Sequence, residues 1–199
     1  MKPLNEESDK KKTIIEKYNS TSNFYDDRYR KIQNEKYAIQ LKNTNFKHKT
    51  LLDAGCGTGL MFEFIFSVNN HNSLRDLRYI GLDISWKMLK TFTNKINMLN
   101  YKGNSSLILG DIEYLPFREE AFDLIFSITS LQNLQSLKKG LNELIRVGKK
   151  NTILKLSILK KQLKLQEVKT YLNSYVINLK TEILEGLEDI IIQGNLNKE

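Results

Sequence analysis

The amino-acid sequence predicts an α/β fold in which a doubly wound, mostly parallel β-sheet carries helices on both faces. Short apolar segments typical of buried strands alternate with longer segments of helical periodicity, and such alternation with right-handed crossovers gives a parallel sheet. In addition, Asp53, Asp83 and Asp111 each stand at the end of one of the first three strand segments. The carboxyl ends of parallel strands meet at one edge of the sheet, so these carboxylates should converge beside the switch point after the first strand.

The individual elements follow from local signals. About thirty residues separate Asp53 from Asp83, which is the room needed for one helix and a return crossover. Ser85 is placed to cap the helix that follows it, and residues 149–151 are expected to form the turn into the fifth strand. The last two strands are expected to pair in antiparallel fashion. Strands are expected at about residues 51–54, 78–82, 106–110, 121–127, 152–157, 176–184 and 188–192, and helices at about 58–67, 85–98, 136–147 and 160–174.

Length and composition indicate one globular domain. The chain has 199 residues, of which 40% are hydrophobic, and this supports one sizeable core with little room for a second. Residues 1–9 are expected to be disordered, and residues 10–43 are expected to be helical with an imperfect apolar stripe. We therefore divide the chain into an N-terminal tail and helical cap, residues 1–43, and a ligand-binding domain, residues 44–199.

Three glycines at alternate positions follow the first strand, in the run LLDAGCGTGL at residues 51–60. Glycine tolerates positive φ and has no Cβ, so this turn lets the backbone approach a ligand whose polar end meets the N–H groups of the next helix. The dinucleotide fingerprint and the phosphate loop require other residues after the second and third glycines. Leu60 and Met61 stand there instead, so a pyrophosphate cradle and NTP hydrolysis are both disfavoured.

With these motifs the chain resembles the class I S-adenosylmethionine (SAM) dependent methyltransferases, which have a Rossmann-like fold with a seven-stranded sheet. The resemblance implies SAM as the cofactor and residues 44–199 as the SAM-binding methyltransferase domain. It implies that Asp83 accepts hydrogen bonds from the ribose, that Asp111 accepts one from the adenine amino group, and that Ser127 lies at the methionine end. The candidate cofactor residues are Asp53, Gly55, Cys56, Gly57, Gly59, Asp83, Ile84, Asp111, Ile112 and Ser127.

Some of these residues also have a purely structural interpretation. An aspartate at a strand end often only caps the next helix, and for Asp83 taken alone this is as good an explanation as ribose binding. We expect Asp123 to be structural. We expect the Cys56 side chain to pack, because no second cysteine or suitably placed histidine supports nucleophilic catalysis. His48 and His71 stand apart in polar stretches, so no metal site is expected.

The motifs leave the methyl acceptor more open than the cofactor. The sulfonium already activates the methyl group, so alignment of the acceptor matters most, and no catalytic residue is assigned. Residues 127–133, SITSLQN, lack the Asn/Asp-Pro-Pro-aromatic motif of the adenine-N6 and glutamine-amide branches, which leaves ring-nitrogen, oxygen or carbon acceptors. The core motifs resemble the small-subunit rRNA guanine-N7 methyltransferases, although Trp86 replaces the usual proline. They also resemble enzymes that methylate tRNA wobble uridine or small molecules such as quinones.

RNA, either rRNA or tRNA, is the first acceptor hypothesis. The formal net charge is +8, and residues 138–169 hold nine lysines and Arg146 against only two glutamates, a pattern that nucleic acid would exploit. A second basic run occupies residues 10–12, although such runs are often just solvated helix faces. The alternatives are a small-molecule methyltransferase acting on a quinone-like acceptor and a non-catalytic binding subunit with a methyltransferase fold.

The resemblance also suggests where substrate and partners would bind. Tyr25, Tyr29 and Arg30 are candidates for the substrate mouth, although a tyrosine stripe at helical spacing is more often core packing. Several related RNA enzymes work with a small zinc-binding activator protein that pairs with the sheet edge, so such a partner is a further hypothesis. A single cysteine, the lack of an apolar signal segment and the lack of about 18 consecutive apolar residues predict a cytoplasmic protein without a membrane span.

Overall fold

The strands form one twisted sheet in the order β3-β2-β1-β4-β5-β7-β6. The structure is a computed structural model, and it describes residues 4–69, 74, 76–101, 103–162, 165–183 and 186–198. Neighbouring strands are parallel except at β7, which runs antiparallel to both β5 and β6. The strands are β1 Thr50–Ala54, β2 Arg78–Asp83, β3 Asn104–Leu109, β4 Phe122–Ile128, β5 Gly148–Leu159, β6 Val176–Ile183 and β7 Asp189–Leu196. The predicted doubly wound, mostly parallel seven-stranded sheet is therefore confirmed.

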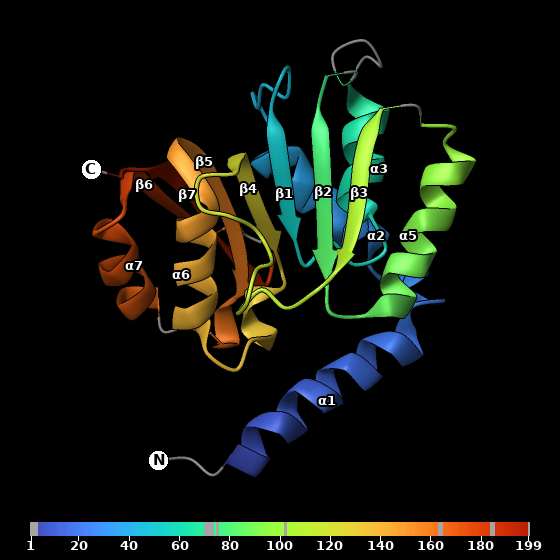
Figure 1. Cartoon of the computed structure of the whole chain (residues 1–199), viewed down its shortest axis with the longest axis horizontal. Helices are drawn as coiled ribbons and strands as arrows, with labels where there is room; N and C mark the ends of the chain where they lie inside the picture. Colours follow the sequence, from blue (N-terminus) through green and yellow to red (C-terminus); the bar gives the residue numbers. More distant parts are fainter. Residues whose placement is uncertain are drawn as a thin grey trace.

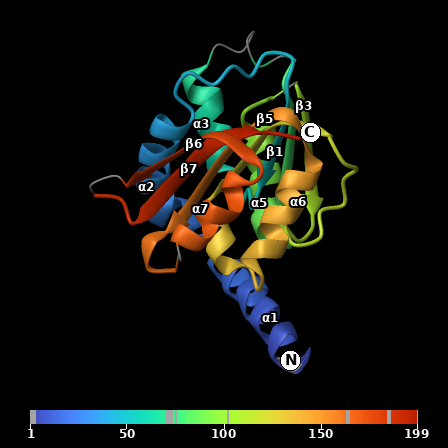
Figure 2. The same cartoon turned by 90° about the vertical axis from the view of Figure 1, so that its left-hand side faces the viewer.

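Helices cover both faces of this sheet (Figures 1 and 2). Helices α2, α3 and α5 pack on one face, and α6 and α7 pack on the other. Helix α1 differs from them because it crosses below the carboxyl ends of the strands (Figure 1). The helices are α1 Leu4–Thr21, α2 Tyr25–Gln40, α3 Leu60–Val68, α5 Trp86–Met98, α6 Leu137–Val147 and α7 Leu165–Asn173, with short 3-10 turns at Leu131–Asn133 and Lys160–Gln162.

The hydrophobic core forms two clusters, one on each face of the sheet. Adjacent residues of a strand point to opposite faces, so Leu51 belongs to the cluster under α3 and Leu52 to the cluster under α6. Leu124 and Ile125 divide in the same way on β4. Strands buried on both faces have continuous apolar runs, which explains why these segments were recognisable in the sequence.

The N-terminal segment differs from its prediction. Helix α1 begins at Leu4, so the expected disorder is wrong for residues 4–9, while residues 1–3 lie outside the described part of the chain. Once the segment after Lys10 is docked, extending the helix toward the N-terminus costs little, because helix propagation is far easier than nucleation. The single helical stretch expected over residues 10–43 is interrupted at residues 22–24, where the N–H of Phe24 bonds to the carbonyl of Thr21 at 3.0 Å and closes a turn.

The region before β5 also differs from its prediction. Residues 149–151 belong to the strand, which begins at Gly148 and contains an irregularity in its pairing with β4. Asn151 has a φ of +66° there, so the expected turn is present as a bulge inside the strand. The expected cap at Ser85 is confirmed, since its side chain accepts a hydrogen bond from the N–H of Met88. Within the described residues, no helix has the length and apolar character needed to cross a membrane.

Candidate functional site

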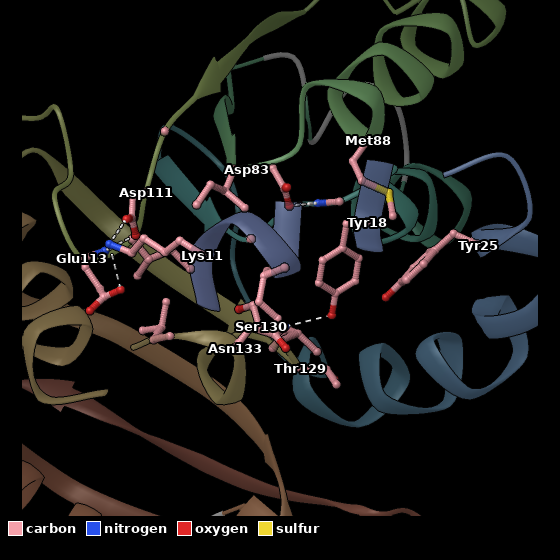
Figure 3. Close-up of a pocket in the computed structure, with 18 residues that line it drawn as sticks. Lys11, Tyr18, Tyr25, Asp83, Met88, Asp111, Glu113, Thr129, Ser130 and Asn133 are labelled. Atoms are coloured by element: carbon pink, nitrogen blue, oxygen red, sulfur yellow. Dashed lines mark hydrogen bonds and ion pairs between the residues drawn. The ribbon is translucent and has the colours of Figure 1, made fainter. Parts of the chain in front are cut away.

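A crevice lies at the carboxyl ends of β1, β2 and β4, where the strand order reverses between β1 and β4. Ligands of open α/β sheets bind at such a switch point. Helix α1 forms the outer wall, so the crevice is enclosed between the sheet edge and this helix (Figure 3). The crevice is lined by Lys11, Ile14, Tyr18, Tyr25, Gly55, Gly57, Asp83, Ile84, Met88, Gly110, Asp111, Ile112, Glu113, Ile128, Thr129, Ser130, Asn133 and Leu134.

The glycine loop forms the base of this crevice. The N–H groups of Gly55 and Cys56 both donate to the carbonyl of Leu82, which ties the loop to β2. A Cβ on Gly55 would lie 2.4 Å from the Cβ of Ser130, so the approach of the two segments requires glycine. Gly57 has a φ of +54°, and no described atom lies within 4 Å of the position that its Cβ would take. The loop is therefore packed at Gly55 and open at Gly57, as a ligand cradle should be.

Asp83 connects the glycine loop to the start of α5. One carboxylate oxygen accepts from the N–H of Gly57 at 2.9 Å (Figure 3). The other accepts from the N–H of Ser85 at 2.8 Å. Burial raises the pKa of the Asp83 carboxyl, while the bonds from Ser85 and Gly57 oppose this rise. Each carboxylate oxygen can accept a second hydrogen bond. Asp83 can therefore hold the loop and still accept from two hydroxyl groups of a ribose.

Asp53 lies beneath the loop and is not among the residues that line the crevice. Its side chain is 3% exposed and accepts a hydrogen bond from the Tyr79 hydroxyl. Burial raises the pKa of Asp53 from 3.8 to about 7, and the bond from Tyr79 opposes part of this rise. Direct contact between Asp53 and a cofactor thus stays a prediction. The position of the side chain suits a residue that supports the loop from behind.

The raised pKa of Asp53 predicts a pH-dependent stability. Between its ordinary pKa near 3.8 and its folded value of about 7, the folded protein holds a proton that the unfolded chain releases. Asp53 therefore contributes its full share to the free energy of unfolding below its ordinary pKa. This contribution decreases by roughly 1 kcal/mol for each pH unit as the pH rises toward the folded pKa. Urea denaturation at pH 5, 6 and 7 should show Asp53→Asn gaining stability relative to wild type, on the order of 2 kcal/mol from pH 5 to pH 7. A constant difference across these pH values would contradict the assigned pKa.

Asp111 is held by a cation from α1. Lys11 Nζ lies 2.5 Å from a carboxylate oxygen of Asp111 and 3.2 Å from one of Glu113 (Figure 3). Lys10 donates to the carbonyl of Leu134 at 2.6 Å. With α1 in this position the cavity in the crevice has a volume of about 80 Å³. Pockets that hold small-molecule ligands usually have volumes of roughly 300 Å³ or more. We infer that α1 moves outward when a cofactor enters.

This ion pair gives a second prediction. Lys11 pairs with the carboxylate that the family resemblance assigns to the adenine amino group. Lys11→Met should therefore tighten SAM binding by up to about 5-fold, because a partly exposed pair contributes up to ~1 kcal/mol. Calorimetric titration measures the dissociation constant. Lys12→Met is the matched control, because Lys12 is an exposed neighbour on the same helix. Weaker binding by Lys11→Met alone would show that Lys11 supports the bound cofactor instead of opposing its entry.

Three other predicted cofactor residues lie outside the crevice lining. Ser127 is fully buried, and its hydroxyl donates to the carbonyl of Ala54 at 2.9 Å, which ties β4 to β1. Gly59 caps α3, and a Cβ there would lie 2.2 Å from the ring of Phe92. Cys56 is buried, as expected, and its sulfur limits the space at Gly81 of β2. Ile84, Asp111 and Ile112, in contrast, line the crevice, and their contact with a cofactor stays a prediction.

A second cavity of about 510 Å³ adjoins the crevice, and two of the three candidate substrate residues line it. Tyr25 lines both spaces and Tyr29 lines the second, whereas Arg30 is absent from the described lining of either. Arg30 forms ion pairs with Asp26 and Glu63 and helps to join α2 to α3, and its role at the substrate mouth stays a prediction. The second cavity is lined by Lys17, Tyr18, Thr21, Phe24, Tyr25, Arg28, Tyr29, Ile32, Gln33, Lys36, Thr129, Gln132, Asn133, Leu159, Glu188 and Asp189.

Sequence reasoning treated residues 1–43 as a tail and helical cap but named no residue of α1 at the crevice. Lys11, Ile14 and Tyr18 all line it, and Tyr18 accepts a hydrogen bond from the Asn133 amide at 2.8 Å. Their spacing of three and four residues places them on one helix face, which is the signal that would have found them. The sequence also placed the edge of the site at Ser127, whereas Thr129 and Ser130 line the crevice because β4 continues to Ile128.

The fold and the crevice together define the class of SAM-dependent methyltransferases: a doubly wound sheet, an open glycine loop at the switch point and an aspartate at the end of each of two neighbouring strands. Residues 52–156 match the family model described as "Methyltransferase domain", and the chain belongs to this family. The finer resemblance to rRNA guanine-N7 methyltransferases stays a prediction.

Relatives and solved structures agree with this assignment. The chain is 34% identical over 115 residues to a malonyl-[acyl-carrier protein] O-methyltransferase of Hamiltonella defensa subsp. Acyrthosiphon pisum (strain 5AT), covering 58% of this chain and 40% of the relative. It is 35% identical over 101 residues to a demethylmenaquinone methyltransferase of Desulfitobacterium hafniense (strain Y51), covering 50% of this chain and 38% of the relative. The chain thus spans about two fifths of the length of these relatives.

A solved structure shares the fold over nearly the whole chain. Magnesium protoporphyrin IX methyltransferase from Synechocystis PCC 6803 with bound SAM superimposes with a TM-score of 0.71 at 17% identity, covering 95% of this chain and 97% of that one. At this identity the likeness concerns the fold alone. The superposition covers more of the chain than residues 52–156, which match the family model.

Proposed function

We propose that this protein transfers a methyl group from SAM to a small-molecule acceptor. The observation that carries the proposal is the second cavity, which adjoins the cofactor crevice and shares Tyr18, Tyr25, Thr129 and Asn133 with it. Its volume of about 510 Å³ falls within the range of about 300–1,000 Å³ that is typical of small-molecule pockets. The names of the two curated relatives, which describe an acyl-carrier-bound and a quinone-type acceptor, support the same choice.

The crevice suits SAM group by group. Asp83 would accept from the ribose hydroxyls, and the apolar Ile84 and Ile112 would cover the adenine ring. The open position at Gly57 allows the methionine end to approach the backbone. SAM supplies an activated methyl group, so the residues of this chain have to bind the acceptor, orient it and exclude water. Helix α1 forms the outer wall of the crevice and is placed to exclude water.

The RNA acceptor, in contrast, loses part of its support. Many cations of the basic region form contacts within the protein: Arg146 pairs with Glu143, and Lys149 pairs with Asp123. Lys155 is 7% exposed and bonds to the carbonyl of Gln40. These side chains add to the formal charge but present less of it to a phosphate backbone. RNA, a zinc-binding activator and a cytoplasmic location remain predictions from the sequence.

Transfer of a tritiated methyl group from SAM tests this proposal. Purified protein is incubated with separate small-molecule, lipid, protein and RNA fractions, and each reaction is repeated with RNase. We expect label in the small-molecule or lipid fraction that resists RNase. Label in RNA that disappears with RNase would overturn the small-molecule assignment. If calorimetry detects no SAM binding, the chain is instead a binding subunit with a methyltransferase fold.

A further inference from the structure

Thr129 lies where the two cavities meet. It follows β4 directly and lines both the cofactor crevice and the second cavity. Its φ is +56°, and this left-handed conformation is rare for a β-branched residue. Such strain persists only where surrounding contacts fix the backbone, and it is concentrated at functional sites. The junction is where a methyl group would pass from cofactor to acceptor.

Buried polar groups fix the direction of the Thr129 hydroxyl. The hydroxyl donates to one carboxylate oxygen of Asp189 at 2.7 Å, and Lys36 Nζ donates to the hydroxyl at 2.9 Å. Lys36 also pairs with the other Asp189 oxygen at 2.8 Å, and Ser157 donates to Asp189 at 2.7 Å. Lys36 is 3% exposed and Asp189 is 1% exposed, so water competes little for these bonds. The network keeps the hydrogen of the Thr129 hydroxyl directed toward Asp189.

This arrangement leaves Thr129 only as a hydrogen-bond acceptor toward a ligand. A hydroxyl has one hydrogen and two lone pairs. The hydrogen is directed to Asp189 and one lone pair to Lys36. The Ser157 hydroxyl oxygen lies 3.2 Å from Thr129 Oγ1, but Ser157 donates its own hydrogen to Asp189, so the second lone pair of Thr129 is the capacity that remains. A ligand group that approaches Thr129 Oγ1 must therefore donate an O–H or N–H.

Gln33 gives a second, independent indication of the same kind. Its side chain lines the second cavity from α2 and is 4% exposed. Among the residues that the structure describes, its amide oxygen has no hydrogen-bond partner. A buried carbonyl oxygen without a partner costs free energy, so it favours a ligand that supplies a donor. Thr129 and Gln33 thus line the same cavity, and each has an oxygen that can accept a hydrogen bond from a ligand.

We propose that the second cavity is the acceptor site and that it selects molecules that supply O–H or N–H hydrogens to the acceptor oxygens Thr129 Oγ1 and Gln33 Oε1. This inference rests on the proposed methyl transfer and names its substrate class. The rings of Tyr25 and Tyr29, whose centroids are 4.7 Å apart, offer an apolar surface for the body of such a molecule. A molecule that presents only acceptor atoms leaves both oxygens unpaired, and sites built this way reject such analogues strongly.

A matched pair of probes tests the selection without knowledge of the natural acceptor. p-Cresol carries a donor O–H, whereas 4-methylanisole has the same ring with the donor replaced by a methoxy group. Ligand-observed NMR titration in the presence of S-adenosylhomocysteine measures the binding of both. We expect wild type to bind p-cresol at least about 5-fold more tightly, as one net hydrogen bond implies.

Substitutions then assign the preference to the two residues. Thr129→Val keeps the shape and removes the hydroxyl, and Gln33→Leu removes the amide. Each should reduce the preference for p-cresol to about 2-fold or less, and the double variant should abolish it. Thr129→Ser should retain the preference. Gln40→Leu is the matched control, because Gln40 is a buried glutamine on the same helix that also has unpartnered amide atoms among the described residues and does not line the cavity.

The outcomes separate this inference from the proposed function. Normal calorimetric SAM binding with equal binding of both probes, or with no binding of either, overturns the acceptor-site inference and leaves methyl transfer standing. Loss of the preference in Gln40→Leu, or its persistence in Thr129→Val and Gln33→Leu, overturns the roles of Thr129 and Gln33. Absence of SAM binding by wild type refutes the proposed function instead.

Discussion

Asp83→Ala is expected to weaken SAM binding by about 100-fold or more. The carboxylate is placed to accept from both ribose hydroxyls, and each hydrogen bond to a charged group contributes about 1.5–3 kcal/mol. The substitution also removes the partner of the Gly57 and Ser85 N–H groups, so the cradle itself loosens. Isothermal titration of wild type and variant gives the two dissociation constants directly.

Asp123→Ala is the control for a lost carboxylate. Asp123 also accepts from a backbone N–H, that of Thr50 at 2.9 Å, and it pairs with Lys149 at 2.9 Å. It lies near the amino end of β4, whereas the crevice lies at the carboxyl ends of the strands. SAM affinity should change by less than about 3-fold in this variant, even where its stability decreases. Equal SAM affinity in Asp83→Ala and wild type would remove Asp83 from the binding site.

The cofactor crevice could be predicted to the extent that its residues lie in local motifs. A strand, a glycine turn and a helix follow one another within residues 50–68, and Asp83 and Asp111 each stand next to the strand that positions them. The spacing of such motifs and the rules of parallel sheets bring these residues together without further information. Gly55, Gly57, Ile84 and Ile112 were predictable for the same reason.

Contacts distant in sequence could not be predicted. Lys11 meets Asp111 across 100 positions, and Lys36 meets Asp189 across 153, so both pairs depend on how α1 and α2 dock. A lysine in a charged helix has the same local pattern whether it stays solvated or enters a crevice. The strained backbone at Thr129 could not be predicted either, because no local pattern indicates that this β-branched residue takes a positive φ. The cavity proposed for the methyl acceptor is built from such contacts between segments that are far apart in the sequence.

Gly57→Ala is expected to weaken SAM binding at least about 5-fold, because its Cβ would project into the space that the cofactor needs and such overpacking costs about 1–3 kcal/mol. No described atom lies within 4 Å of that Cβ, so the substitution creates no clash in the free protein. The residue nevertheless has a φ of +54°, and an alanine in this conformation should lower stability by about 1 kcal/mol. Calorimetry measures the affinity, and urea denaturation measures the stability.

Gly186→Ala separates the two effects. Gly186 lies between β6 and β7, has a φ of +81°, and likewise has no described atom within 4 Å of its Cβ position. The backbone strain should therefore cost about the same in both variants, roughly 1 kcal/mol, because it depends on the left-handed conformation alone. Only Gly57→Ala should lose SAM affinity. A similar loss in both variants would attribute the effect to general destabilisation, and no loss in either would place the cofactor away from the glycine loop.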